Sequence, residues 1–307
     1  MGGDEIGPEK VWDVAVVGGG VAGLTASSYL ARAGFSCLLI NAENLGGKVR
    51  SLRKIENWPG MLEGISGLEL TQRFIAQSYS RGVVFRTDRI GSIERGAFSI
   101  SLEGNKERYR ALSVIVATGT VFKSLNIAGE RKLAGRGLYH SAFYVKDRWD
   151  GEEVGVVGGG EAAAHQALEL AERGARVRLF IRRDRLKVTK HLAACVEKTG
   201  KIVLERNRIV IEAVGEREVC GVVSVGTNGE GRRLDRVNAI FVLIGQKPSL
   251  PRGTRNTEGV FIAGDARIGS RRQGSIAASD GFAKAMDCED FLISRCRAGI
   301  LGGFGED

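Results

Sequence analysis

The 307-residue sequence has few cysteines and few histidines, and their spacing is uninformative for metal binding. The five cysteines are Cys37, Cys195, Cys220, Cys288 and Cys296. No two of them form a C-x-x-C pair, and the spacing fits no zinc pattern. This favours a reduced, cytoplasmic protein with buried thiols. The three histidines also lack partners at metal-ligand spacing, so we predict no metal site.

Long hydrophobic runs are absent as well. No apolar run reaches the roughly 18 residues that a transmembrane helix needs, and the first ten residues lack the apolar core of a secretory signal. Aromatic residues make up only 7% of the chain, and the excess of 45 Lys and Arg over 36 Asp and Glu is scattered. Nucleic-acid and membrane binding are therefore disfavoured. An acidic protein partner or a phosphorylated cofactor fits the +9 charge better.

A G-x-G-x-x-G motif organises the N-terminal part of the chain. Gly18, Gly20 and Gly23 follow an apolar run and precede a helix predicted over residues 24–33 and a strand over 37–40. In such a unit the first glycine permits a tight turn, the second lets the backbone approach a pyrophosphate, and the third lets the helix pack closely on the strand. The helix N-terminus offers free N–H groups and a positive dipole end to the phosphates.

The same pattern recurs as G-x-G-x-x-A at Gly158, Gly160 and Ala163, between an apolar run and a helix predicted over 164–173. Two dinucleotide motifs in one chain indicate that electrons pass from one nucleotide cofactor to another. The remaining predicted elements are a helix over 68–80, short strands over 83–85, 90–93, 98–102, 108–112 and 176–181, and a separate buried strand from residue 114 that ends in a turn at Thr118 and Gly119.

Further motifs follow in a characteristic order. They read G-G at 46–47, E-N-W-P-G at 56–60, A-T-G at 117–119 and G-V-F-I-A-G-D at 259–265. This series resembles low-molecular-weight thioredoxin reductases from about residue 11 to about residue 293. The resemblance implies an α/β fold with two Rossmann-like three-layer domains. An NAD(P)H-binding domain over residues 120–244 is inserted into an FAD-binding domain over 1–119 and 245–307. It also implies a homodimer.

The resemblance implies a set of FAD contacts. Asn41 stands where an acid would bind the ribose of NAD, which favours FAD at the first motif. A helix after Gln273 is expected to face the flavin pyrimidine, where its positive end would stabilise negative charge on the reduced flavin. The alternative for Arg272 is a solvated surface residue. The implied FAD-binding residues are Gly18, Gly20, Gly23, Glu43, Gly46, Gly47, Asn57, Thr118, Gly119, Gly264, Asp265, Arg272 and Gln273.

The second motif is expected to hold NADPH in preference to NADH. Gly158, Gly160 and Ala163 would support the dinucleotide. Arg182, Arg183 and Lys187 resemble the family's H-R-R-x-x-x-R, which grips the 2′-phosphate. Ile181 replaces the histidine of that motif, and Lys187 replaces its last arginine. The alternative is an ordinary charged strand end.

Two departures from the family pattern bear on function. Ala162 and His165 replace a hydroxyl residue and a glutamate beside the second motif, and His140 and Phe143 stand where the family has its redox cysteines. His140 is either an acid–base group or a packed, hydrogen-bonded residue, so no catalytic residue is assigned with certainty. We expect an FAD-dependent NAD(P)H oxidoreductase that passes hydride from NADPH to FAD. The acceptor would then be dioxygen, a quinone, a ferredoxin or a small disulfide. The alternative is a non-catalytic flavoprotein that acts as a sensor or partner.

Overall fold

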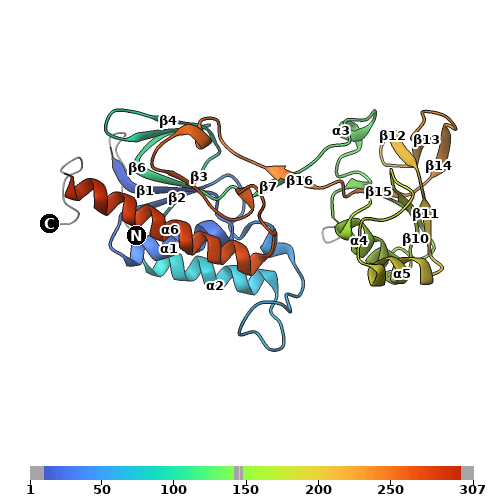
Figure 1. Ribbon diagram of the computed structural model, residues 1–307, viewed down its shortest axis with the longest axis horizontal. Helices are drawn as coiled ribbons and strands as arrows, with labels where there is room; N and C mark the ends of the chain where they lie inside the picture. The colour runs from blue at the N-terminus through green and yellow to red at the C-terminus, as the bar shows by residue number, and fades with distance from the viewer. Residues whose placement is uncertain (1–9, 142–144, 146–147, 299–307) are drawn as a thin grey trace. The chain divides into compact units, whose positions relative to one another are not determined.

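The computed structural model describes residues 10–141, 145 and 148–298 (Figure 1). The chain divides into two compact units. Unit 1 combines the residues up to Val121 with those from Pro248 onward, and unit 2 comprises Phe122–Lys247. The boundaries predicted from the sequence lie after residues 119 and 244. Phe143 and its neighbour Ala142 lie outside the described residues.

Unit 1 is built on a mixed seven-stranded sheet in the order β3-β2-β1-β6-β5-β4, with β17 also paired to β6. Strands β1, β2, β3, β6 and β17 run parallel, whereas β4 and β5 form antiparallel pairs. The strands are β1 (Val11–Val17), β2 (Cys37–Asn41), β3 (Val84–Thr87), β4 (Ile90–Arg95), β5 (Ile100–Gly104), β6 (Arg108–Val116) and β17 (Val260–Ile262).

Three helices of unit 1 lie together on one side of this sheet (Figure 1). They are α1 (Val21–Arg32), α2 (Gly67–Ser80) and α6 (Gly274–Arg297), with short 3-10 helices η1 (Gly47–Ser51), η3 (Thr254–Asn256) and η4 (Gly264–Ala266). Helix α1 packs closely on α6, because a Cβ added at Gly281 would stand 2.2 Å from the Ala22 carbonyl oxygen. Helix α2 begins at a side-chain cap, where the Ser66 hydroxyl accepts from the Glu69 N–H at 3.1 Å.

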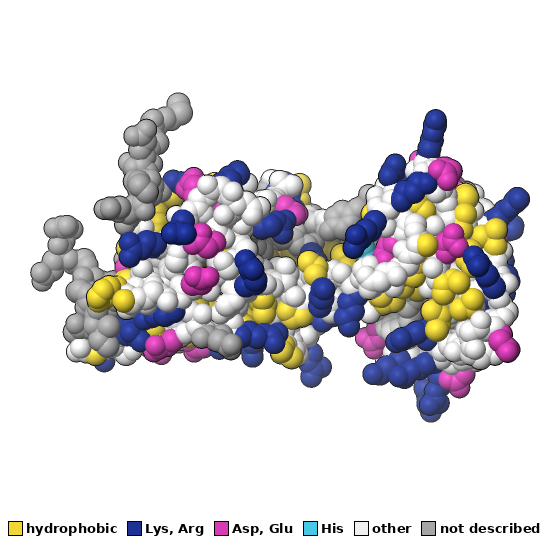
Figure 2. All heavy atoms as spheres, turned by 90° about the horizontal axis from the view of Figure 1, so that it is seen from above, with side chains coloured by type: hydrophobic (Ala, Val, Ile, Leu, Met, Phe, Trp, Pro, Cys, Tyr) yellow, Lys and Arg dark blue, Asp and Glu magenta, His cyan; other side chains and the backbone are white. Residues whose placement is uncertain are grey.

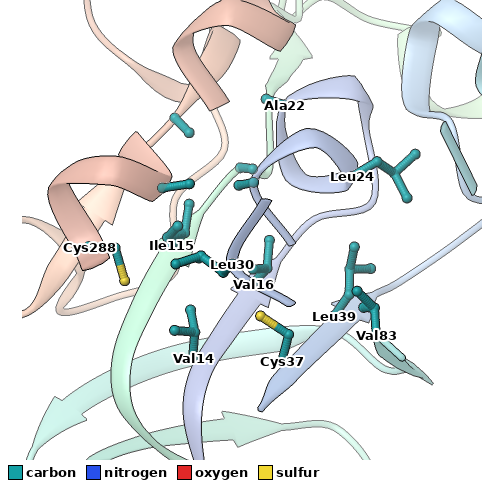
Figure 3. Close-up of a cluster of buried hydrophobic side chains, with 14 of the residues drawn as sticks. Val14, Val16, Ala22, Leu24, Leu30, Cys37, Leu39, Val83, Ile115 and Cys288 are labelled. Carbon is teal, nitrogen blue, oxygen red and sulfur yellow. The ribbon is translucent and has the colours of Figure 1, made fainter. Parts of the chain in front are cut away.

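Strand β1 is buried on both faces, as its apolar run predicts. Val14 and Val16 pack under the helices with Leu24, Leu39 and Ile115 (Figure 3). The alternate residues of β1 pack instead against the antiparallel strands β4 and β5. Because successive side chains of a strand point to opposite faces, helices, parallel strands and antiparallel strands form three layers.

Strand β6 corrects the sequence prediction of two strands over 108–112 and from 114. It is one strand, whose first half pairs antiparallel with β5 and whose last residues pair parallel with β17. Ser113 interrupts the apolar pattern, yet it is fully buried. Its hydroxyl donates to the Gly259 carbonyl at 2.8 Å and accepts from the Cys288 thiol at 3.2 Å. These bonds satisfy the polar group within the core.

Unit 2 contains a five-stranded parallel sheet in the order β11-β10-β9-β15-β8 and an antiparallel sheet β12-β13-β14. The parallel strands are β8 (Leu138–Tyr139), β9 (Glu153–Val157), β10 (Arg176–Phe180), β11 (Ile202–Glu205) and β15 (Ala239–Val242). The others are β12 (Arg208–Val214), β13 (Gly221–Gly226) and β14 (Arg233–Arg236). Its helices are α3 (Glu130–Leu133), α4 (Glu161–Glu172) and α5 (Lys190–Lys198). Strands β7 (Thr120–Phe122) and β16 (Gln246–Pro248) form a two-stranded sheet.

A cluster of ion pairs joins the strands of unit 2. Arg178 on β10 lies 2.7 Å from Glu205 on β11 and 3.4 Å from Asp235 on β14. Arg233 on β14 contacts the same two carboxylates at 2.7 and 2.9 Å. Both carboxylates are buried, so removing either one would leave a guanidinium partly uncompensated.

The short segment after Pro248 runs along β4. The Ile93 N–H donates to the Arg252 carbonyl at 2.8 Å, and the Arg252 N–H donates to Gly91 at 2.9 Å. A Cβ at Gly253 would stand 1.9 Å from the Ile93 carbonyl oxygen, so the backbone of this segment lies very close to β4.

Among the described residues, none of the helices has the length and apolar character needed to span a bilayer.

Candidate functional site

The three glycines of the unit 1 turn differ in the space that surrounds them. At Gly18, with φ of +110°, an added Cβ would stand 2.4 Å from the Ala117 carbonyl oxygen, and at Gly23 it would stand 1.9 Å from the Gly18 carbonyl oxygen. Gly20 differs, because nothing lies within 4 Å of a Cβ there. The first and third glycines are thus required by packing. The second borders open space at the N-terminus of α1, where a pyrophosphate fits.

A second loop packs against this turn. The Gly46 N–H donates to the Gly19 carbonyl at 2.7 Å, and Gly47 comes so close to Gly20 that an added Cβ would stand 3.1 Å from its Cα. Both residues have positive φ, +100° and +58°, which favours glycine. The sequence predicted these two positions as cofactor contacts, and the structure places them directly beside the Gly18–Gly20 turn.

Asn41, at the end of β2, supports the same turn. Its side-chain oxygen accepts from the Gly19 N–H at 2.8 Å, and its amide nitrogen donates to the Glu43 carbonyl at 2.7 Å. The Glu43 carboxylate lies 3.1 Å from Arg89, and both side chains are exposed. The predicted contact residue Glu43 therefore has a partner within the protein at the rim of the site.

The residues that follow β6 contribute Thr118, Gly119 and Thr120, the last of which begins β7. The Thr118 hydroxyl donates to the Ser249 carbonyl, and nothing lies within 4 Å of a Cβ added at Gly119. The buried Thr120 hydroxyl accepts from the Lys48 ammonium at 2.8 Å. The sequence analysis assigned no role to Lys48 or Thr120, and no local signal joins two residues so far apart in the chain.

The segment before α6 completes the group in unit 1. The Gly264 N–H donates to Asp280 at 2.6 Å, and Asp265 accepts from the Ser270 hydroxyl at 3.1 Å. The side-chain oxygen of Gln273, the N-cap residue of α6, accepts from the Asn57 amide at 3.2 Å. This contact joins two predicted site residues that are distant in sequence.

Two cations, Lys48 and Arg272, and the Asp265 carboxylate act on one another in this cradle. Burial lowers the pKa of Lys48, the Arg272 guanidinium lowers it further, and the Asp265 carboxylate opposes both effects. Arg272 is exposed to solvent, and its charge also acts electrostatically on the Lys48 ammonium. Helix α6 has neither a side-chain cap hydrogen bond nor an acidic residue in its first turn, so its N-terminal dipole is uncompensated there. An anionic ligand fits this environment.

Unit 2 repeats the local architecture of the first turn. A Cβ at Gly158 would stand 2.4 Å from the Leu243 carbonyl oxygen, Ala163 is fully buried, and Gly160 again has nothing within 4 Å. The Lys187 N–H donates to the Gly159 carbonyl at 2.7 Å, the same length as the bond between Gly46 and Gly19. Backbone geometry thus places Lys187 at the edge of the second turn.

A groove of about 670 Å³ lies next to this turn. Two of its lining residues, Arg183 and Lys187, were predicted as phosphate contacts, whereas the exposed Arg182 is not among the lining residues. The sequence analysis missed three further basic residues of the lining, Arg185, Lys190 and Arg206. Arg206 lies 3.0 Å from Glu197, which also lines the groove. Basic side chains also spread over the face of each unit that Figure 2 shows.

The His140 side chain contacts the aromatic ring of Phe122 and the backbone carbonyl of Val242. Its ring stacks on Phe122 with centroids 4.9 Å apart and 4° between the planes, and its Nδ1 lies 3.1 Å from the Val242 carbonyl oxygen. Because a carbonyl only accepts, Nδ1 carries the hydrogen. Of the two alternatives for His140, an acid–base group or a packed, hydrogen-bonded residue, this geometry matches the second. Phe143 falls outside the described residues.

The cysteines form no disulfide. Burial raises the pKa of Cys37 and raises that of Cys288 to about 12, so both thiols are poor nucleophiles. The Cys195 sulfur lies 3.7 Å from the His191 ring. Within the described part of the chain, no group of His, Cys, Asp and Glu side chains could hold a metal ion.

Comparisons with known proteins agree with this arrangement. The family model "Pyridine nucleotide-disulphide oxidoreductase" matches residues 12–268. The chain is 32% identical to the bifunctional thioredoxin reductase/thioredoxin of Mycobacterium leprae (strain TN), covering 92% of this chain and 66% of that relative. It is 31% identical to the thioredoxin reductase of Peptoclostridium acidaminophilum, covering 92% of this chain and 98% of that protein.

Among solved structures, Lactococcus lactis thioredoxin reductase (FR conformation) superposes with a TM-score of 0.82 at 27% identity, covering 92% of this chain and 99% of that chain. The predicted α/β fold with two Rossmann-like domains is thereby confirmed. The chain belongs to the pyridine nucleotide-disulphide oxidoreductase family, in its thioredoxin-reductase-like branch of FAD- and NAD(P)H-dependent oxidoreductases.

Proposed function

We propose that this protein is an NADPH-dependent flavin oxidoreductase that passes its electrons to an acceptor other than thioredoxin. The observation that carries the proposal is the absence of a dithiol. The sequence has no C-x-x-C pair, and His140 occupies the position of one family redox cysteine. A dithiol is the usual means of passing two electrons to a protein disulfide.

The residues of unit 1 suit FAD. Gly20 and the N-terminus of α1 would hold the pyrophosphate, while Gly46 and Gly47 would border it. Asn57 and Gln273, joined by their hydrogen bond, would hold the flavin next to the N-terminus of α6. When bound, FAD accepts a hydride from a nicotinamide and passes the electrons on.

In unit 2, Gly160 and the N-terminus of α4 would hold the pyrophosphate of NADPH. Arg183 and Lys187 would face the 2′-phosphate from the groove. Their positive charge would favour NADPH over NADH, whose ribose carries a neutral hydroxyl at the same place.

His140 supports the choice of acceptor. Because its Nδ1–H is engaged by the Val242 carbonyl and its ring stacks on Phe122, the residue acts as a packing group in place of a thiol. Candidate acceptors are dioxygen, a quinone, a small disulfide or an acidic carrier such as ferredoxin. The net charge of +9 favours an acidic protein, since opposite charges accelerate association.

The alternative is a non-catalytic flavoprotein that binds FAD and NADP as a sensor or partner. Ala162 and His165 favour it, because both are exposed on the first turns of α4 and neither supplies the hydroxyl or carboxylate found in the family. A nicotinamide would have fewer polar contacts at this surface.

An anaerobic titration separates the two proposals. The purified protein, reconstituted with FAD, is mixed with NADPH while the absorbance of the oxidised flavin is followed. Rapid bleaching supports the oxidoreductase, and an unchanged spectrum supports the non-catalytic flavoprotein. The reduced protein is then offered thioredoxin, ferredoxin and a quinone in turn. Robust NADPH-dependent turnover with thioredoxin would contradict the proposed acceptor.

We also propose a homodimer, as the family resemblance implies. Phe282 and Met286 on α6 are 45% and 46% exposed, and a second copy would cover such apolar side chains. Light scattering coupled to size-exclusion chromatography would measure the mass, and a monomer at micromolar concentration would contradict the proposal.

A further inference from the structure

Lys48 occupies a position in the unit 1 cradle that the motifs do not explain. It belongs to η1, directly after Gly47, whose backbone lies against Gly20. Its ammonium donates to the Thr120 hydroxyl at 2.8 Å, and Thr120 is only 6% exposed. The side chain therefore extends from the phosphate-binding turn to the residues that follow β6. The hydrogen bond fixes the position of the charge.

Lys48 belongs to a small group of charged side chains in the unit 1 cradle. Arg272 and Asp265 both act electrostatically on its ammonium, and Asp265 already accepts from Ser270 at 3.1 Å. Arg272 precedes α6, whose first turn carries no acidic residue. One guanidinium and one carboxylate therefore act on Lys48, so these three side chains together carry one net positive charge, and the N-terminus of α6 adds its positive dipole end to the cradle.

A fixed cation distinguishes two ligand states that differ in charge. A flavin gains electrons on reduction and so becomes a better partner for a nearby ammonium. Arg272, which acts electrostatically on Lys48, directly precedes Gln273, the partner of Asn57 at the proposed flavin end. The charge of Lys48 would then act mainly on the part of the cofactor that changes charge.

We propose that Lys48 stabilises the reduced flavin relative to the oxidised flavin and thereby raises the midpoint potential of the bound cofactor. This inference rests on the proposed FAD site. The two electrons come from NADPH, or from dithionite in an assay, and Lys48 keeps its proton throughout. Lys48 is a residue that tunes the cofactor, and it exchanges no atom with it.

The test is an anaerobic redox titration of the FAD-loaded protein against a reference dye. Lys48→Gln should weaken binding of the reduced cofactor about tenfold relative to the oxidised cofactor, which lowers a two-electron potential by about 30 mV. Lys48→Arg keeps the charge and should stay close to wild type. Lys284→Gln removes an α6 lysine that pairs with Asp287 and serves as the matched control, with no change expected.

Thr120→Val is the second probe, and it applies even where Lys48→Gln fails to retain FAD. It keeps the lysine but removes its hydrogen-bond acceptor, so we expect a smaller drop in the same direction. Unchanged potentials in whichever of Lys48→Gln and Thr120→Val retain FAD would overturn the inference. Equal loss of affinity for both redox states would also overturn it, because that result describes a phosphate contact. A wild-type protein that takes up no FAD instead contradicts the proposed function.

Discussion

The basic groove of unit 2 yields a prediction about cofactor choice. Arg183 lines the groove, whereas its neighbour Arg182 does not, although both are exposed and both match the family motif. We therefore expect Arg183→Ala to weaken NADPH binding much more than Arg182→Ala. Neither substitution should alter NADH binding by more than about twofold, because the ribose hydroxyl of NADH carries no charge.

The expected magnitude follows from exposure. A charge-assisted hydrogen bond contributes about 1.5–3 kcal/mol, but the Arg183 guanidinium is in an open groove where water and salt screen it. We therefore expect a value just below this range, about 1.4 kcal/mol, which corresponds to a tenfold rise in the Kd for NADPH. Lys187→Ala should have a similar effect, since its backbone is fixed at Gly159 by a bond of 2.7 Å.

The assay is a calorimetric titration of each variant with NADP+ and NAD+ at two salt concentrations. These oxidised nucleotides differ in the same 2′-phosphate as NADPH and NADH, and they do not transfer a hydride to the flavin. The wild-type preference should shrink as salt is added. Two results would refute the reasoning: equal affinity of the wild type for both nucleotides at low salt, or equal losses from Arg182→Ala and Arg183→Ala. Either result would make these arginines an ordinary charged strand end.

Four further predictions concern the glycine turn of unit 1 and two buried carboxylates. Gly23→Ala should destabilise the protein by about 1–3 kcal/mol in chemical denaturation, because its Cβ would stand 1.9 Å from a carbonyl oxygen. Gly20→Ala, where a Cβ has open space, should instead leave the Tm of the FAD-free protein unchanged and weaken FAD retention, and a large drop in the Tm of the FAD-free protein would contradict this. Glu205→Gln should cost about 2 kcal/mol, less than the roughly 3–5 kcal/mol of fully buried pairs, since its partner Arg178 is 31% exposed; thermal melts at two salt concentrations would check this. Burial opposes the charge of Asp88, but backbone N–H groups and a tyrosine hydroxyl outweigh it and hold its pKa below the usual value. Its stabilising contribution is therefore present above about pH 4 and is lost as pH falls through the folded pKa. Asp88→Asn should lower the Tm at neutral pH and reduce the loss of stability on acidification, and parallel pH profiles of Tm for variant and wild type would disprove the assignment.

The glycine turns show how much of the site the sequence could predict. Gly18 and Gly158 have φ of +110° and +149°, Gly23 leaves no room for a Cβ, and Ala163 is fully buried. These are local backbone and packing requirements, so they leave a fixed pattern of residue types in the sequence. The strands and helices around both turns were predictable for the same reason, because apolar periodicity is also local.

Other features depended on the tertiary structure. The continuity of β6 was hidden because Ser113 reads as a polar interruption, and only the contacts with Gly259 and Cys288 show how it is satisfied. The fold likewise decided which of the two adjacent arginines lines the groove, since both are exposed. A motif places both at the end of a strand but does not say which way each side chain points.

The sequence by itself determined the two dinucleotide turns, the family and the absence of a C-x-x-C pair. Only the tertiary structure joined Lys48 to Thr120 and Asn57 to Gln273, pairs separated by 72 and 216 residues. It also brought Lys190 and Arg206 to the groove beside Arg183. Such contacts arise from chain folding around a shared core. They leave no periodicity or spacing in the sequence, because each partner is constrained by a neighbour that is close in space and remote along the chain.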